Sequence, residues 1–234
     1  AGAGNDTLLV DEDIVRNSFV DLGEGDNFVS IGDEITSSAT LFAGAGNDTL
    51  LIDDAIENES FADVGDGDNF VSIGDDITSS ATLFAGAGND TLLVDADIVR
   101  NSLVDVGGGD NFVSIGDDIT SSATLFAGAG NDTLLVDADI VNNSFVDLGE
   151  GDNFVSLGSE ISRSATLFAG AGNDTLIAED IEYESLVDVG NGDNFVSLTN
   201  EITSTATLFA GAGNDTLLIG DAIEDESFVD VGEG

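Results

Sequence analysis

The sequence predicts an all-β protein that folds as a parallel β-solenoid of about eleven coils, with 21 residues in each coil. Three observations predict this fold: Gly-x-Gly landmarks recur at a fixed spacing, small or aliphatic residues alternate at period two between them, and Pro is absent. A fixed period of roughly 20 to 50 residues is typical of solenoids. A helix is not expected, because β-branched residues at period two contradict a 3.6-residue period.

The landmarks set the length of one coil. They begin at positions 2, 23, 44, 65, 86, 107, 128, 149, 170, 190, 211 and 232. The spacing is 21 residues throughout, except for one 20-residue unit after Gly170. Every second unit is most alike, so that two coils form a 42-residue sequence repeat. We expect residues 1–234 to be a single repetitive solenoid segment and a piece of a longer array, since both ends fall inside a repeat.

Two short alternating segments in each coil predict two strands. The segments SATLFA (38–43) and DTLLID (48–53) flank the turn GAGN. Positions 39, 41, 43, 50 and 52 carry small or aliphatic residues in nearly every coil, which predicts one buried face on both strands. An Ile follows the second strand in every coil and is predicted to fill the core under the second turn. These residues are Ile14, Ile35, Ile56, Ile77, Ile98, Ile119, Ile140, Ile161, Ile181, Ile202 and Ile223.

The composition limits the possible functions. Forty-eight acidic residues oppose three basic ones, for a net charge of −45. This charge repels nucleic acid and favours cations as partners. His and Cys are absent, which excludes imidazole and thiolate metal sites and His-dependent catalysis. We expect no enzyme, because the carboxylate pairs recur on every coil without a unique pocket, and no membrane insertion, because no apolar run could span a bilayer.

The segment AGAGNDTLL (43–51) resembles the RTX nonapeptide, Gly-Gly-x-Gly-x-Asp-x-hydrophobic-x, with Ala in place of the first Gly. The resemblance implies a secreted, calcium-bound β-roll, in which turn Asp side chains and Gly carbonyls of adjacent coils hold the ions. The chain departs from the family pattern in having one Gly-x-Gly turn per coil. Alternate coils also place Asn where the family has Asp, so the ion count does not transfer. These residues are Asn27, Asn69, Asn111, Asn153 and Asn194.

The order of Asn and Asp at this turn alternates from coil to coil. In a parallel stack, a column of identical Asp residues would place like charges ~5 Å apart. Alternation avoids this, and one interpretation is a ladder in which amide donors flank each carboxylate. The other interpretation is a calcium ion held by one Asp per coil with Gly carbonyls. The candidate ligands are Asp6, Asp26, Asp48, Asp68, Asp90, Asp110, Asp132, Asp152, Asp174, Asp193 and Asp215.

The second turn, after the four-residue strand, has a denser acidic pattern. Most coils place two carboxylates within three residues there, as in VDEDI and IGDDI. Carboxylates stacked ~5 Å apart either point into water or bind hard cations, and the sequence leaves both open. The candidate calcium ligands at this turn are Asp13, Asp76, Asp97, Asp118 and Asp139.

All fourteen Phe fall at positions predicted to point outward. They either shield the sheets or mediate contact with other molecules, so self-association through Phe-bearing faces or coil ends is expected. The predicted function is a non-enzymatic structural module of a secreted, extracellular or cell-surface protein: a calcium-stabilised rigid rod that forms or extends a filament or adhesin. The alternative is a ligand- or surface-binding module, part of an adhesin or surface layer, that uses the Phe faces.

Overall fold

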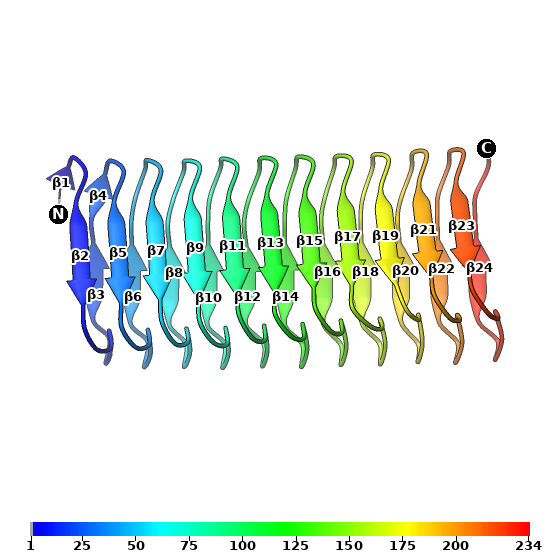
Figure 1. Ribbon diagram of the computed structural model, residues 1–234, viewed down its shortest axis with the longest axis horizontal. Helices are drawn as coiled ribbons and strands as arrows, with labels where there is room; N and C mark the ends of the chain where they lie inside the picture. The colour runs from blue at the N-terminus through cyan, green and yellow to red at the C-terminus, as the bar shows by residue number, and fades with distance from the viewer. Residues whose placement is uncertain (1) are drawn as a thin grey trace.

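The computed structural model is a parallel β-solenoid, as the sequence predicts (Figure 1). It describes residues 2–234, and Ala1, the first residue of the predicted segment, lies outside them. Each coil contributes a four-residue strand to one 11-stranded sheet and a three-residue strand to another. Within residues 2–234 we find no helix that is long and apolar enough to cross a membrane.

The strands of both sheets follow one another at one-coil intervals. The four-residue strands are β2 (Thr7–Val10), β5 (Phe28–Ile31), β7 (Thr49–Ile52), β9 (Phe70–Ile73), β11 (Thr91–Val94), β13 (Phe112–Ile115), β15 (Thr133–Val136), β17 (Phe154–Leu157), β19 (Thr175–Ala178), β21 (Phe195–Leu198) and β23 (Thr216–Ile219). The three-residue strands are β3 (Phe19–Asp21), β6 (Thr40–Phe42), β8 (Phe61–Asp63), β10 (Thr82–Phe84), β12 (Leu103–Asp105), β14 (Thr124–Phe126), β16 (Phe145–Asp147), β18 (Thr166–Phe168), β20 (Leu186–Asp188), β22 (Thr207–Phe209) and β24 (Phe228–Asp230). Two further short strands, β1 (Gly2–Ala3) and β4 (Gly23–Glu24), pair with each other in parallel.

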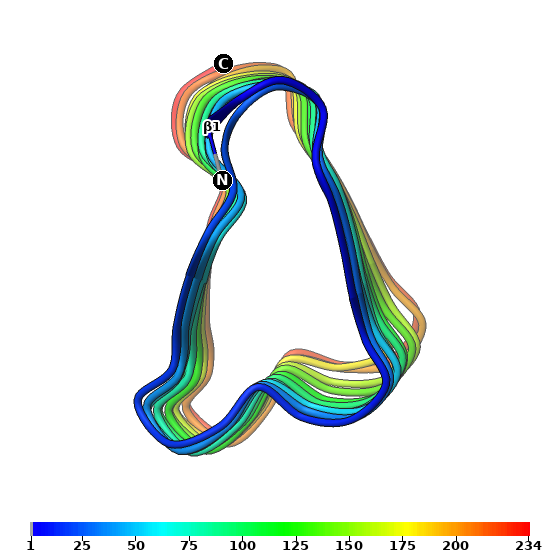
Figure 2. The ribbon, with the colours of Figure 1, turned by 90° about the vertical axis from the view of Figure 1, so that its left-hand side faces the viewer.

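The core lies between the two sheets, which form the long sides of the cross-section (Figure 2). Leu41 on β6 and Leu50 on β7 are fully buried, which confirms the predicted inward face. The recurrent Ile forms a third, one-residue ladder of parallel bridges, such as Ile35 to Ile56, and both of these residues are 0% exposed. None of the fourteen Phe is buried, as predicted.

The second turn contains a feature that the sequence did not indicate. After the buried Ile, two consecutive residues other than Gly adopt left-handed backbone conformations, as at Asn58 (φ 55°) and Glu59 (φ 60°). Such pairs recur in every described coil, and single left-handed residues other than Gly are uncommon because Cβ crowds the carbonyl oxygen. The N–H of Ser60 then donates to the carbonyl of Glu57 at 3.3 Å. The pair thus redirects the chain from the Ile ladder to the three-residue strand.

The 20-residue unit keeps its register in all three ladders. Only two residues separate Ala178 from Ile181, whereas three separate Val136 from Ile140. Ala178 still pairs with Leu198, and Ile181 still bridges its neighbours in the Ile ladder. The pairs between β17 and β19 end at Ser156 and Ile177, so the missing residue is absorbed in the second turn and at the adjoining end of β19.

Candidate metal sites in the glycine turns

The glycine turn connects each three-residue strand to the four-residue strand of the same coil. Between β6 and β7, Gly44 (φ 107°) and Gly46 (φ 135°) adopt backbone conformations that other residues rarely enter. A Cβ at Gly44 would lie 1.8 Å from the carbonyl oxygen of Gly23 in the preceding coil. The turns therefore stack through bare backbone, and this contact brings carbonyl oxygens of adjacent coils close together.

One column of alternating Asp and Asn faces the interior. Asp48 is 1% exposed and Asn69 is 2% exposed. Each backbone N–H donates to the Oδ1 atom of the following coil: Asn27 to Asp48 at 2.7 Å, and Asp48 to Asn69 at 2.9 Å. We call this set the buried column. It consists of Asp6, Asn27, Asp48, Asn69, Asp90, Asn111, Asp132, Asn153, Asp174, Asn194 and Asp215.

The neighbouring column points outward, and its hydrogen bonds run in the opposite direction. The N–H of Asp26 donates to Oδ1 of Asn5 in the preceding coil at 3.0 Å, and the N–H of Asn47 donates to Oδ1 of Asp26 at 3.0 Å. We call this set the exposed column. Its predicted ligands, all exposed to solvent, are Asp26, Asp68, Asp110, Asp152 and Asp193.

The predicted amide ladder exists, but its donors differ from the expectation. Backbone N–H groups supply the hydrogen bonds in both columns, because the one-coil register brings each of them within reach of an Oδ1 atom. Of the two columns, within residues 2–234, it is the exposed one in which Asn side chains donate to Asp, as from Asn173 Nδ2 to Asp152 Oδ1 at 3.0 Å. Oδ1 of Asp and Oδ1 of Asn accept these backbone hydrogen bonds equally well. The alternation of Asp and Asn therefore matters through the second side-chain atom, which is Oδ2 in Asp and Nδ2 in Asn.

In the buried column, that second atom is an amide nitrogen in every other coil. Nδ2 of Asn69 donates to the carbonyl oxygens of Gly65 at 2.8 Å, Gly67 at 3.0 Å and, from the next coil, Ala85 at 2.9 Å. The buried Asn residues of the other coils repeat two or three of these contacts. Carbonyl oxygens of two successive coils therefore converge on one position.

In the intervening coils, the atom at the same position is a carboxylate oxygen. Oδ2 of Asp48 is buried and has no hydrogen-bond partner. By the one-coil register, it occupies the place of Nδ2 in Asn69, and it therefore faces the carbonyls of Gly44, Gly46 and Val64. Within residues 2–234 no hydrogen bond to these three carbonyl oxygens is found. The same unpartnered Oδ2 occurs in Asp48, Asp90, Asp132, Asp174 and Asp215.

Burial makes these carboxylates difficult to ionise. It raises the pKa of Asp90, Asp132 and Asp174 to about 6 each, and it raises the pKa of Asp48. An ionised oxygen that faces only carbonyl oxygens is unfavourable unless a cation neutralises it. Carboxylate and carbonyl oxygens are the ligands that Ca²⁺ prefers. The residues of the buried column therefore fit a calcium ion at each such Asp.

The exposed column lacks this geometry. Its Asp side chains lie in solvent and already accept backbone N–H groups through Oδ1. Hydrogen bonds from the backbone and the side chain of Asn214 lower the pKa of Asp193, which favours its ionised form without a metal. Of the two columns that the sequence presents as equivalent, only the buried one directs unpartnered oxygen atoms at carbonyl groups.

The second-turn candidates form a column of their own. The N–H of Asp97 donates to Oδ1 of Asp76 at 3.0 Å, and the N–H of Asp118 donates to Oδ1 of Asp97 at 2.8 Å. Asp13, Asp118 and Asp139 accept in the same way. In the described part of the chain, one trio approaches the spacing of a metal site: Asp97, Asp117 and Asp118, whose carboxylate oxygens lie within 4.8 Å of one another.

The second turn nevertheless differs from the glycine turn. Burial raises the pKa of Asp76 and Asp118, and neighbouring carboxylates raise both further. Among residues 2–234, buried carboxylate oxygens without a partner occur only in the glycine turns. The carboxylates of the second turn therefore have solvent and backbone amides available to them, and a cation is not required there.

Five further Asp residues accept a hydrogen bond from the first Gly of the glycine turn and were not among the predicted ligands. Oδ1 of Asp63 accepts a hydrogen bond from the N–H of Gly65 at 2.9 Å. An Asp two residues before a Gly is the spacing of an Asx-turn, and this spacing could have revealed them. The set is Asp63, Asp105, Asp147, Asp188 and Asp230.

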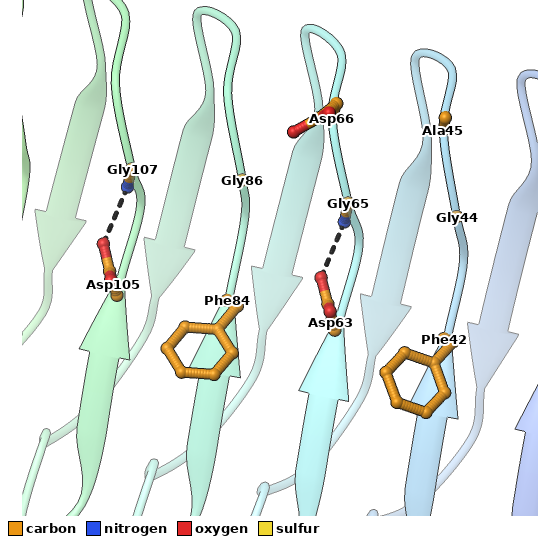
Figure 3. A pocket seen from close by; sticks show the side chains of 10 residues that line it. All are labelled: Phe42, Gly44, Ala45, Asp63, Gly65, Asp66, Phe84, Gly86, Asp105 and Gly107. Atoms are coloured by element: carbon orange, nitrogen blue, oxygen red, sulfur yellow. Dashed lines mark hydrogen bonds between the residues drawn. The ribbon is translucent and has the colours of Figure 1, made fainter.

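A shallow groove runs beside these Asp residues on the outer face of the three-residue strands. It has a volume of about 490 Å³ and is lined by Phe42, Asp63, Phe84, Asp105 and the adjoining turn glycines (Figure 3). The Phe rings of successive coils contact one another across the strands, as at Phe42 and Phe61, whose centroids are 5.5 Å apart. Aromatic and acidic side chains thus alternate along this face.

Comparison with known proteins identifies related sequences and structures. A sequence model described as the RTX calcium-binding nonapeptide repeat (4 copies) matches residues 39–51, 81–97, 123–139, 163–180 and 207–220. The crystal structure of a hyperactive, Ca²⁺-dependent, β-helical antifreeze protein from an Antarctic bacterium matches with a TM-score of 0.71 and 26% sequence identity. The match covers 94% of this chain and 64% of that one. A search of curated proteins found no match.

Proposed function

Since the chain belongs to the RTX calcium-binding β-roll family and binds calcium, we propose that it is a non-enzymatic structural module of a secreted protein. In this role it is a rigid rod, stabilised by calcium, that forms or extends an extracellular filament or adhesin. The family is a structural, non-catalytic one. The continuous core and the unbroken ladders over eleven strands of each sheet support a role in spanning distance.

The unpartnered Oδ2 of the buried Asp residues is the observation that carries this proposal. An unpartnered Oδ2 of this kind is found at every second coil, where it faces carbonyl oxygens. The chain as a whole has a net charge of −45. A calcium ion at each of these positions supplies positive charge that the protein lacks. Because the site is assembled from two successive coils, binding calcium and stacking the coils are the same event, and the binding free energy contributes to folding.

In a secreted protein, the coupling between calcium binding and folding sets where the chain folds. Calcium is scarce in the cytosol and abundant outside the cell, so an acidic chain of this kind stays unfolded until export and folds when its sites fill. The ligands proposed for calcium are Asp48, Asp90, Asp132, Asp174 and Asp215 with the turn carbonyls. Asp6 holds the same position in the first coil, where it is partly exposed.

A surface-binding module is the second candidate, and the Phe face favours it. The alternating Phe and Asp residues of the groove offer an apolar and anionic surface along the rod. Self-association through this face, or a ligand bound to it, is part of the proposal. The outward faces of this chain are a poor match for the antifreeze activity of the matched protein. An ice-binding face requires a regular array, and here each outward Thr pairs with a Phe, as Thr40 does with Phe61.

Far-UV circular dichroism and negative-stain electron microscopy of the purified chain, in EGTA and in millimolar calcium, test the proposal. The expected result is a coil-to-β transition, with rods present only in calcium. Rods and a cooperative melt that are identical in EGTA would contradict it. Rods that thicken with protein concentration support self-association, whereas isolated rods at all concentrations favour a monomeric spacer.

A further inference from the structure

The two glycine turns of the 42-residue repeat are chemically different. We call a coil an Asn coil or an Asp coil after its residue in the buried column. The two kinds of coil differ at the second side-chain atom of that residue and at the position two residues before the first turn Gly. The Asn coils contain Asn27, Asn69, Asn111, Asn153 and Asn194. The Asp coils contain Asp6, Asp48, Asp90, Asp132, Asp174 and Asp215.

The turn of an Asn coil is satisfied by the protein itself. In the coil of Asn69, the side-chain amide donates to the carbonyls of Gly65, Gly67 and Ala85. In addition, Asp63 accepts the N–H of Gly65 at 2.9 Å. The carbonyl oxygens that converge at this turn therefore already have a donor, and none of them requires an ion.

The turn of an Asp coil lacks both devices. Oδ2 of Asp48 cannot donate when ionised, so the equivalent carbonyls of Gly44, Gly46 and Val64 lose the donor that Asn69 provides in its own coil. The residue equivalent to Asp63 is Phe42, which cannot accept a hydrogen bond. Within residues 2–234 no hydrogen bond from the N–H of Gly44 is found. The two differences recur together throughout the array.

We infer that the side-chain amide of each Asn coil is a built-in substitute for calcium, and that the array holds an ion at the glycine turns of the Asp coils only. The amide presents its two N–H groups to carbonyl oxygens equivalent to those that face the cation in the neighbouring coil. Replacing Asp with Asn in the buried column keeps Oδ1, which the ladder uses in both coil types. The inference rests on the proposed function, because it takes calcium at the buried Asp as its premise.

This arrangement divides the rod into coils whose turns need no ion and coils whose turns need calcium. An Asn coil needs no ion to complete its turn once the coils stack, whereas an Asp coil completes its turn only when an ion binds. Asn coils and Asp coils alternate, so each ion lies between an Asp coil that needs it and an Asn coil that does not. Calcium thus controls whether the coils stack into a continuous rod, and the ion count is about half of what one site per coil would require.

The decisive variant carries Asp48→Asn, Asp90→Asn, Asp132→Asn and Asp174→Asn in the full chain. Its matched control carries Asp68→Asn, Asp110→Asn, Asp152→Asn and Asp193→Asn, which remove the same charge from the exposed column. Bound calcium is counted by equilibrium dialysis, and folding is followed by circular dichroism in EGTA and in calcium. The buried-column variant is expected to bind four fewer ions than the parent and to keep its β signal in EGTA. The control is expected to match the parent in both measurements.

The outcomes separate this inference from the proposed function. A parent chain that binds no calcium would overturn both. A parent that binds calcium, with a buried-column variant that keeps the same ion count, still requires calcium or folds in neither buffer, would overturn the inference alone. The converse substitutions Asn69→Asp and Asn111→Asp provide an independent check: they are expected to add two ions, and an unchanged count would contradict the inference.

Discussion

Asp48 and Asn69 occupy the same position in successive coils and are joined by a hydrogen bond of 2.9 Å from the N–H of Asp48 to Oδ1 of Asn69, yet only Asn69 has a partner for its second side-chain atom. The two side chains have nearly the same shape, so the difference between them is one of charge and donor capacity. Their alternation therefore changes the chemistry of every second turn while the backbone repeats unchanged.

The calcium-free chain is expected to become less stable as the pH rises from about 4 to about 6. Burial raises the pKa of Asp90, Asp132 and Asp174 to about 6 in the folded chain, whereas an unfolded Asp titrates near 4. Between these values the folded state binds more protons than the unfolded state, so its stability is greatest below this interval and is lost across it. Nearby carboxylates such as Asp68 and Asp110 act in the same direction.

Thermal melting in EGTA at pH 4.5, 5.5 and 7 measures this dependence. The variant with Asn at the four buried Asp positions is expected to show a weaker dependence, because the groups with the raised pKa are gone. Stability of the parent that increases with pH in EGTA would contradict the assignment of these groups as buried and unneutralised.

Gly107→Ala is expected to disrupt the coil in which it lies, whereas Gly108→Ala is expected to be tolerated. A Cβ at Gly107 would lie 1.5 Å from the carbonyl oxygen of Gly86, and its φ of 75° is unfavourable for Ala. A Cβ at Gly108 would meet nothing nearer than 3.6 Å. Ala87 and Ala129 already occupy the equivalent position in adjacent coils.

Denaturant unfolding in calcium compares the two Gly variants. Strain and steric conflict predict a loss of about 1–3 kcal/mol or more in the free energy of unfolding for Gly107→Ala. A change of less than about 0.5 kcal/mol is expected for Gly108→Ala. Equal effects of the two substitutions would show that close stacking of the turns is not what requires glycine.

Tyr183→Asn is expected to stabilise the rod. Tyr183 has a φ of 49° and is 52% exposed, so it combines a left-handed backbone with little burial. Asn enters this conformation more readily than Tyr, which predicts a gain of about 0.5–1 kcal/mol in the free energy of unfolding. The exposed column offers a comparison, Asn131→Ala, which removes a side-chain hydrogen bond to Asp110 without altering a left-handed residue. No gain, or a loss, from Tyr183→Asn would contradict the strain argument.

Replacing Phe126, Phe145 and Phe168 with Thr is expected to reduce lateral association of the rods. Their rings contact in sequence at centroid distances of 5.8 and 5.6 Å on the outer face of the three-residue strands. The core is untouched, because none of the three is buried. Sedimentation velocity in calcium measures association. The control replaces Phe112 and Phe154 on the four-residue strands, and an equal loss of association there would assign the contact to the other sheet.

The sequence predicts the fold well because the constraint is repeated in every coil. The inward face that contains Leu41 is indicated by the same alternation in each of the eleven coils. The aligned Ile residues indicate the third ladder independently. The left-handed pair at Asn58 and Glu59 could not be predicted, because its residue types vary from coil to coil and no Gly marks it.

The candidate site was predicted only in part. Sequence alone placed Asp48 and Asp68 in neighbouring columns but gave both the same role. Which of them is buried depends on the path of the chain through the turn, and the direction of the hydrogen bonds depends on the register between coils. Neither is encoded in the order of two adjacent residues.

The shortened second turn at Glu179 and Asp180 has a consequence for how such arrays diversify. One residue is missing there, yet Ala178 pairs with Leu198 of the following coil and Ile181 keeps its bridges to both neighbouring coils. Deletions, and by the same reasoning insertions, are accommodated at this edge without shifting a single strand. The wide end of the cross-section is therefore where evolution or an engineer can add loops, tags or whole domains at regular intervals, while the stacked glycines of the narrow end leave no room for a side chain.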